Sequence, residues 1–86
     1  MKIYFIYVTF GSFKEAKRLG GQLVKNKLAA CTNIIPEIYS TYVWKNKTMV
    51  DKECSMIVKT SKPKVEAAIK FIVKKHSYEC PAVSAF

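Results

Sequence analysis

Acidic residues are scarce in this chain of 86 residues, where six Asp and Glu stand against fifteen Lys and Arg, for a formal net charge of +9. Arginine is scarcer still, since Arg18 is the only one. Specific recognition of phosphates or bases favours the guanidinium fork, which lysine cannot supply. A lysine-rich surface attracts polyanions of any kind, or simply keeps a protein soluble. The charge therefore predicts no specific nucleic-acid partner.

The cysteines are few, odd in number and widely spaced: Cys31, Cys54 and Cys80, with no CxxC pair. This pattern argues against a disulfide scaffold or a zinc knuckle, and reduced thiols suit the cytoplasm. No apolar run reaches the roughly 18 residues of a membrane span. The short apolar N-terminus lacks the cleavage site of a signal peptide. These absences predict a cytoplasmic protein without membrane contact.

Three stretches have the composition of strands. Residues 3–10 are rich in β-branched and aromatic side chains and are predicted to form a buried strand. Residues 30–44 form a long strand with a break at Pro36, which cannot donate a ladder hydrogen bond. Residues 48–60 alternate, which puts Cys54 in the core. The Lys45-Asn46-Lys47 segment between the last two stretches supplies a turn, and residues 82–86 can begin a further strand.

Two amphipathic helices are expected between these strands. Residues 13–28 follow a possible Ser12 cap, with apolar or small residues close to helical spacing at Phe13, Ala16, Gly20, Leu23, Val24 and Leu28. Charged residues, Glu15 among them, fill the other faces, and close packing on the sheet would explain the glycines at 20 and 21. A second helix begins after Ser61 and ends near His76, with apolar positions at Val65, Ala68, Ile69, Ile72, Val73 and His76.

The predicted order is βαββαβ, which indicates an α+β, ferredoxin-like domain over residues 1–86 with two helices on one face of a four-stranded antiparallel sheet. The arms of the central hairpin are about 13–15 residues long, against a usual strand length of about 5–6. The helices cannot cover so long a ribbon, and its aromatic side chains would be exposed in a monomer. Strand length alone therefore suggests association between subunits.

Four segments of the chain carry a family resemblance: A-x-C-x-N-x-x-P at residues 29–36, S-x-Y-x-W at 40–44, Glu53 followed by Lys59-Thr60, and H-x-Y-x-x-P at 76–81. Together they make the sequence similar to the CutA family of divalent-cation tolerance proteins. The resemblance implies a PII-like homotrimer in which the long hairpins pair between subunits. It also implies a role in tolerance of copper or another divalent metal, and no enzymatic activity.

The sequence departs from the family pattern at several positions. Relatives usually continue for about 20 residues, enough for one further helix of ordinary size, whereas this sequence ends at Phe86. Relatives proposed to bind copper carry a Cys near the end of the first strand and two adjacent His residues. Val8 and Lys75-His76 stand at those positions here. Asn46 replaces a common turn glycine, and Ala82 replaces an acidic residue.

His76, Cys31 and Cys80 are the candidate metal ligands, because imidazole and thiolate together suit Cu(I) or Zn(II). No cofactor is required on this interpretation, and copper or another divalent metal is the candidate ligand. The alternative for Cys31 is a small buried hydrophobe. The alternative for His76 is a helix-terminal histidine satisfied by a backbone carbonyl. A Cys–His nucleophilic enzyme is the weakest hypothesis, since nothing in the spacing requires one.

Tyr42, Trp44, Lys59 and Tyr78 are candidates for a subunit interface or ligand pocket. Aromatic residues of the hairpin can pack between subunits or, less simply, stack on a ligand. Lys59 can hold an anion at an intersubunit cleft, or pair with Glu53 or Asp51. The other function class considered is an RNA-binding module of the RRM type, which shares the βαββαβ order. It is disfavoured because residues 50–57 contain two acids and no aromatic where an RNP1 strand is rich in aromatics.

Overall fold

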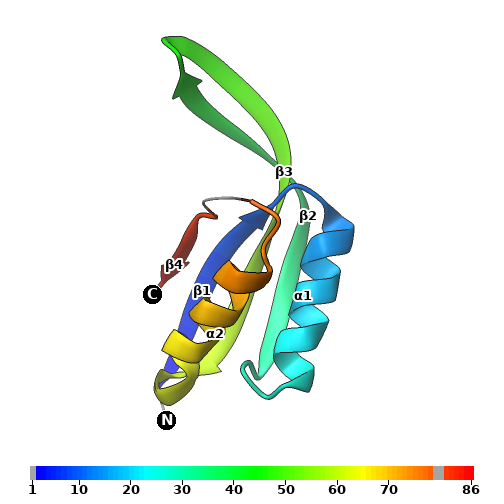
Figure 1. Cartoon of the computed structure of the whole chain (residues 1–86), viewed down its shortest axis with the longest axis vertical. Helices are drawn as coiled ribbons and strands as arrows, with labels where there is room; N and C mark the ends of the chain where they lie inside the picture. The colour runs from blue at the N-terminus through cyan, green and yellow to red at the C-terminus, as the bar shows by residue number, and fades with distance from the viewer. Residues whose placement is uncertain (1, 79–80) are drawn as a thin grey trace.

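The computed structural model describes residues 2–78 and 81–86. Along the chain the elements are β1 (Ile3–Phe10), α1 (Phe13–Lys25), β2 (Cys31–Trp44), β3 (Lys47–Ser61), α2 (Lys62–Lys75) and β4 (Val83–Ala85). The sheet is antiparallel with strand order β2-β3-β1-β4. Both helices lie on the same face of the sheet, as Figure 1 shows. The predicted α+β ferredoxin-like arrangement is confirmed.

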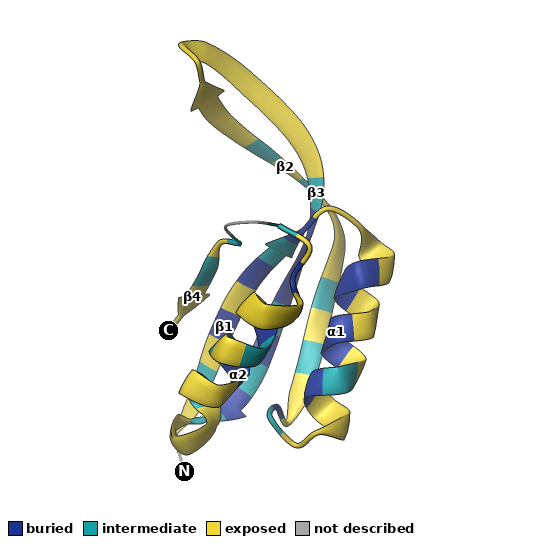
Figure 2. Ribbon diagram, viewed as in Figure 1, coloured by how far each residue is buried: buried dark blue, intermediate teal, exposed yellow. Residues whose placement is uncertain are grey.

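The hairpin of β2 and β3 makes the molecule long, with extents of 43 × 22 × 20 Å. The pairing register shifts between Ile35 and Ile38, so that β2 carries an extra residue at Pro36, the predicted break. Beyond this bulge the hairpin extends past the ends of both helices (Figure 1). No residue from Ile35 to Glu53 is buried (Figure 2). Lys45 and Asn46 both have positive φ, which closes the predicted turn.

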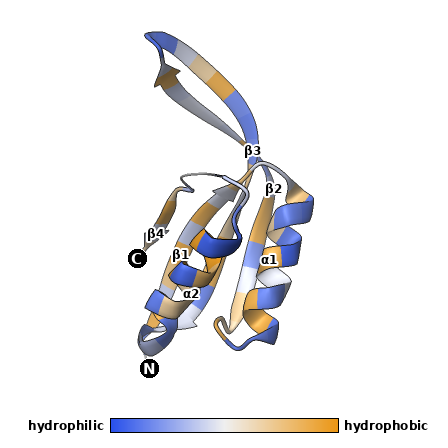
Figure 3. Cartoon of the chain, in the orientation of Figure 1, coloured by the Kyte–Doolittle hydropathy of each residue, from blue (hydrophilic) through white to orange (hydrophobic). Residues whose placement is uncertain are grey.

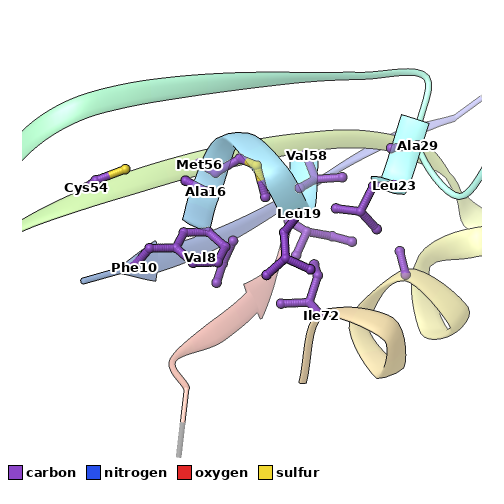
Figure 4. Packing of buried hydrophobic residues seen from close by; sticks show 12 residues of the cluster. Val8, Phe10, Ala16, Leu19, Leu23, Ala29, Cys54, Met56, Val58 and Ile72 are labelled. Atoms are coloured by element: carbon purple, nitrogen blue, oxygen red, sulfur yellow. The ribbon is translucent and has the colours of Figure 1, made fainter. Parts of the chain in front are cut away.

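The core lies between the helices and the sheet (Figure 4). Strands β1 and β3 contribute alternate residues to it, because side chains of a strand point to opposite faces. The fully buried members of these strands and of α1 include Ile6, Val8, Phe10, Leu19, Leu23, Met56 and Val58. Cys54 is buried as predicted, and burial raises the pKa of its thiol. The strand β1 is covered on one face only, so the prediction that it is buried throughout is wrong.

The helices differ from their predicted extents and faces. The end of α1 is at Lys25, three residues before the predicted end, because Asn26 caps it and Lys27 turns into the left-handed region. Phe13, Val24 and Val73 were expected on buried faces and are exposed. Glu15 was expected on a polar face and is buried. The hydroxyl of Ser12 caps α1 by accepting from Glu15 N, at 3.1 Å.

The glycine pair in α1 has two different environments. A Cβ on Gly20 would lie 3.0 Å from both Met56 Sδ and Thr32 Oγ1, whereas a Cβ on Gly21 would meet nothing within 4 Å. Close packing on the sheet therefore explains Gly20, and the same explanation is wrong for Gly21.

We expect Gly21→Ala to stabilise the fold by about 0.5–1 kcal/mol, because alanine restricts the unfolded chain and favours helix. Gly20→Ala should destabilise it by about 1 kcal/mol, since overpacking of about 1–3 kcal/mol outweighs the same helical gain. Urea unfolding of both variants measures the difference. Equal effects of the two substitutions would contradict the packing argument.

Candidate functional site

His76 lies where β1 ends and α2 ends, and its ring is buried. It stacks on Phe10 with 4.5 Å between ring centroids and 7° between planes. The backbone N–H of Tyr78 donates to Nδ1 at 3.0 Å. Because Nδ1 accepts, Nε2 carries the hydrogen and donates to the carbonyl of Thr9, at 2.6 Å. Both ring nitrogens are thus occupied within one protomer, in the manner of a helix-terminal histidine bonded to backbone.

Glu15 joins the start of α1 to the segment after α2. Its carboxylate accepts hydrogen bonds from Ser77 N at 2.7 Å and from Ser77 Oγ at 2.8 Å. One of its oxygens lies 4.0 Å from His76 Nδ1. A buried carboxylate is stable only when polar groups replace its lost water, and Ser77 supplies them. The Ser12-x-x-Glu15 spacing was the only sequence signal near this contact, and it indicates a helix cap rather than a partner at residue 77.

Tyr78 links the same segment to the base of the hairpin. Its hydroxyl donates to Glu53 Oε2 at 2.8 Å, and its ring lies 4.7 Å from that of His76. The ring also packs on Gly11, where a Cβ would lie 3.3 Å from the Tyr78 hydroxyl. Burial, followed by the hydrogen bond to Glu53, raises the pKa of Tyr78 well above its usual value.

The raised pKa of Tyr78 predicts a loss of stability in alkali. Its neutral form is favoured in the folded state, so its contribution is complete below the unfolded value of about 10 and falls as pH rises above it. We expect Tyr78→Phe to flatten the decline of the melting temperature between about pH 9 and pH 11. Thermal melts of both proteins across this range measure the slopes. Parallel slopes would show that Tyr78 does not titrate with folding.

The candidate metal ligands do not meet within one protomer. Cys31 is exposed and pairs with Lys59, whereas His76 bonds to Thr9, which pairs with Ser55. Lys59 lies four residue steps along β3 from Ser55, a distance of roughly 13 Å. Cys31 also shares the open face of the sheet with Lys59, opposite the helices and His76. Cys80 lies outside the described residues.

The described metal-binding groups of one protomer also do not converge on a site for a divalent ion. Among residues 2–78 and 81–86, no group of three or more His, Cys, Asp or Glu side chains is arranged to hold a metal. His76 would have to give up a hydrogen bond to Thr9 or Tyr78 before it could bind one. The described residues of a single protomer therefore do not fit a metal centre.

The other predicted site residues lie in separate parts of the structure. Tyr42 and Trp44 are exposed on the distal hairpin. The Tyr42 hydroxyl donates to Asp51, which raises the pKa of Tyr42. Lys59 lies near the opposite end of the sheet, with Nζ 5.8 Å from the Phe5 ring centroid. The alternative interpretation, a pairing of Lys59 with Glu53 or Asp51, is not among the ion pairs of the described residues.

Comparison with known proteins places this geometry in a family. The family model for the CutA1 divalent ion tolerance protein matches residues 4–86. The chain belongs to the CutA1 family. It is 41% identical over 81 residues to the divalent-cation tolerance protein CutA of Archaeoglobus fulgidus, covering 94% of this chain and 78% of that protein. It is 39% identical over 80 residues to the chloroplastic protein CutA 1 of Oryza sativa, covering 93% of this chain and 45% of that protein.

Solved CutA structures superpose closely on this fold. CutA1 from Ehrlichia chaffeensis matches with a TM-score of 0.95 and 35% identity, covering 99% of this chain and 79% of that one. The CutA of Archaeoglobus fulgidus, described as periplasmic, matches with a TM-score of 0.91 and 38% identity, covering 99% and 82%. The chain thus spans less than half of the rice protein and about four fifths of these two structures. The family and the Archaeoglobus fulgidus relative are named for tolerance of divalent ions and not for an enzymatic reaction.

Proposed function

We propose that residues 1–86 act as one domain and form the subunit of a homotrimer that contributes to divalent metal tolerance and is not an enzyme. The observation that carries this proposal is the hairpin beyond the Ile35/Ile38 bulge, which has no covering element among the described residues. Its exposed side chains include Tyr39, Tyr42, Val43, Trp44 and Val50. Apolar ribbons of this length are a liability unless a second chain covers them.

The face of the sheet opposite the helices supports the same proposal. Phe5, Tyr7 and Ile35 are all exposed there, and the distal hairpin carries further hydrophobic stretches (Figure 3). The outer edge of β2 is also unpaired, because β2 ends the strand order among the described residues. A two-layer domain with an apolar open sheet face needs a further layer to bury it. Subunits placed around a symmetry axis provide that layer, which agrees with the trimer implied by the family resemblance.

The proposal includes weak binding of a metal ion at the boundary between two subunits. The candidate ligands are His76, Cys80 and Cys31, the candidate ion is copper or another divalent metal, and no cofactor is required for folding. Binding through His76 competes with its hydrogen bonds to Thr9 and Tyr78, which lowers the affinity. A neighbouring subunit would have to complete the ligand set. Lys75, next to His76 in the sequence, adds a positive charge that repels the ion by about 1 kcal/mol per unit of ion charge at about 4 Å in water.

Native mass spectrometry with and without Cu and Zn tests the trimeric assembly and the metal binding together. A trimer at micromolar concentration supports the assembly, and a monomer contradicts it. Weak metal binding that His76→Ala abolishes supports the ligand assignment. Tight binding that is unchanged by His76→Ala would show that other residues bind the metal.

RNA binding remains the alternative function of a different class, and we expect it to be absent as a specific activity. Titration of single-stranded RNA and duplex DNA should show weak, salt-sensitive and sequence-independent binding, because lysine contacts phosphates without reading bases. Fluorescence anisotropy at two salt concentrations measures this. Sub-micromolar binding with a sequence preference at physiological salt would overturn the expectation.

A cytoplasmic location completes the proposal. Cys31 and Cys54 are free thiols, which suit a reducing compartment. Among the described residues, no helix has both the length and the apolar character needed to cross a membrane. Relatives bear names that refer to chloroplasts and the periplasm, so compartment varies within the family. Localisation of the tagged protein by cell fractionation would test this assignment.

A further inference from the structure

A cavity of about 390 Å³ opens at the end of the domain farthest from the hairpin. It lies between the turn that follows α1 and the first turn of α2. Ile3, Val24, Ala29 and Ala30 supply its apolar lining, and Lys27, Lys64 and Ser61 supply polar groups. Thr60 also lines the cavity, and its hydroxyl donates to Leu28 O at 2.7 Å, which ties the turn to β3. The volume is in the lower range for small-molecule sites.

The charge around this cavity is of one sign. Two lysines line it, one from the turn after α1 and one from α2, and none of the described lining residues is acidic. Neither Lys27 nor Lys64 takes part in the ion pairs found within the described part of the chain. The first turn of α2 contains no acidic residue, and the Ser61 hydroxyl makes no capping bond to the helix. Positive charge beside an apolar lining favours an anion that also carries an apolar group.

Lys27 holds its place in the cavity wall at a conformational cost. Its φ is 61°, in the left-handed region that favours glycine. The turn is fixed by Lys27 N to Val24 O at 3.0 Å and by Leu28 N to Leu23 O at 2.9 Å, the bonding pattern of a helix end at which glycine is the usual residue. Glycine at this position would therefore relieve the backbone while removing the ammonium group. Lys27→Gly should therefore raise stability but lower ligand affinity. A purely structural role of Lys27 would change the stability alone.

We propose that this cavity binds a small organic carboxylate with a short aliphatic tail, the carboxylate between Lys27 and Lys64 and the tail against Ile3, Val24 and Ala29. The site lies within one protomer and is built from residues other than the candidate metal ligands. It is therefore separate from the metal tolerance proposed above. A ligand of this size in a partly open site should bind with a dissociation constant of about 1 mM.

Titration of the whole chain with isovalerate, followed by amide chemical shifts, tests the proposal. The expected result is saturable shifts at Ala29, Ala30, Thr60 and Ser61. Isoamyl alcohol, which has the same carbon skeleton without the charge, should produce no saturable shift. Inorganic phosphate should bind at least about tenfold more weakly than isovalerate, because it has no group to fill the apolar lining.

Variants test the two lysines separately. Lys27→Gly and Lys64→Gln should each weaken isovalerate binding by about two- to fivefold, the effect of one exposed ion pair. Lys27→Gly should also raise the melting temperature. Lys17→Gln, on the exposed face of α1, is the matched control and should leave binding unchanged. Equal binding of the alcohol, equal binding of phosphate, or an equal loss in the Lys17 control would overturn the proposal.

Discussion

Replacing Phe10 by alanine should lower the free energy of unfolding by about 3–5 kcal/mol, the usual cost of removing a buried aromatic ring. Phe10 is fully buried and is the last residue of β1. Its ring stacks on the His76 ring with 4.5 Å between centroids, and the Tyr78 ring lies 4.7 Å from that of His76. Loss of the Phe10 ring leaves a cavity beneath His76, where the hydrogen bonds to Thr9 and Tyr78 limit how far the chain can collapse.

Urea unfolding at a fixed protein concentration measures this effect, because any subunit association makes stability depend on concentration. Phe13→Ala is the matched control, since Phe13 is the same residue type but is exposed at the start of α1. It should change stability by no more than about 0.5 kcal/mol. The loss of stability in Phe10→Leu should lie between those of Phe10→Ala and Phe13→Ala, because leucine refills much of the volume without stacking on His76. A loss below about 1.5 kcal/mol for Phe10→Ala would mean that the site relaxes freely.

The strands and their order were predictable because period-two patterns and turn residues are local features of a sequence. Alternation placed Cys54 on the buried face of β3, and Pro36 marked the bulge in β2. The prediction for β1 was wrong for an instructive reason. Apolar residues on both of its faces indicated a strand buried on both sides, whereas Phe5 and Tyr7 are exposed. The pattern agrees with a strand whose second face is covered only after association.

The candidate site was less predictable because its contacts are distant in sequence. Glu15 accepts from Ser77, 62 residues later, whereas helical periodicity put Glu15 on a polar face of α1 and did not show which residue lies opposite it. Cys31 and His76 have compatible chemistry, but residue types alone do not reveal that they lie on opposite faces of the sheet. Gly20 and Gly21 are adjacent and identical, yet only Gly20 faces β2 and β3. In each case the missing information was which element packs against the residue.

The proposed trimer makes its largest prediction at Val50. This side chain is 60% exposed, on β3 opposite Thr41, in the part of the hairpin beyond the bulge. A lysine there should be nearly neutral in an isolated subunit, since exposed substitutions change stability by about 0.5 kcal/mol or less. In an assembly that covers the hairpin, the same lysine would bury a charge without a partner, at a cost of several kcal/mol.

Symmetry repeats that cost at every subunit contact, so Val50→Lys should dissociate the trimer. Native mass spectrometry at micromolar concentration should show the particle fall from about 29 kDa, three times the mass of one chain, to the 9.8 kDa of a single chain. Val73→Lys is the matched control, because Val73 is 48% exposed on α2, away from the hairpin and the open sheet face. It should remain trimeric. A Val50→Lys trimer of unchanged mass would mean that the distal hairpin stays in solvent, which leaves the open sheet face as the surface through which subunits associate.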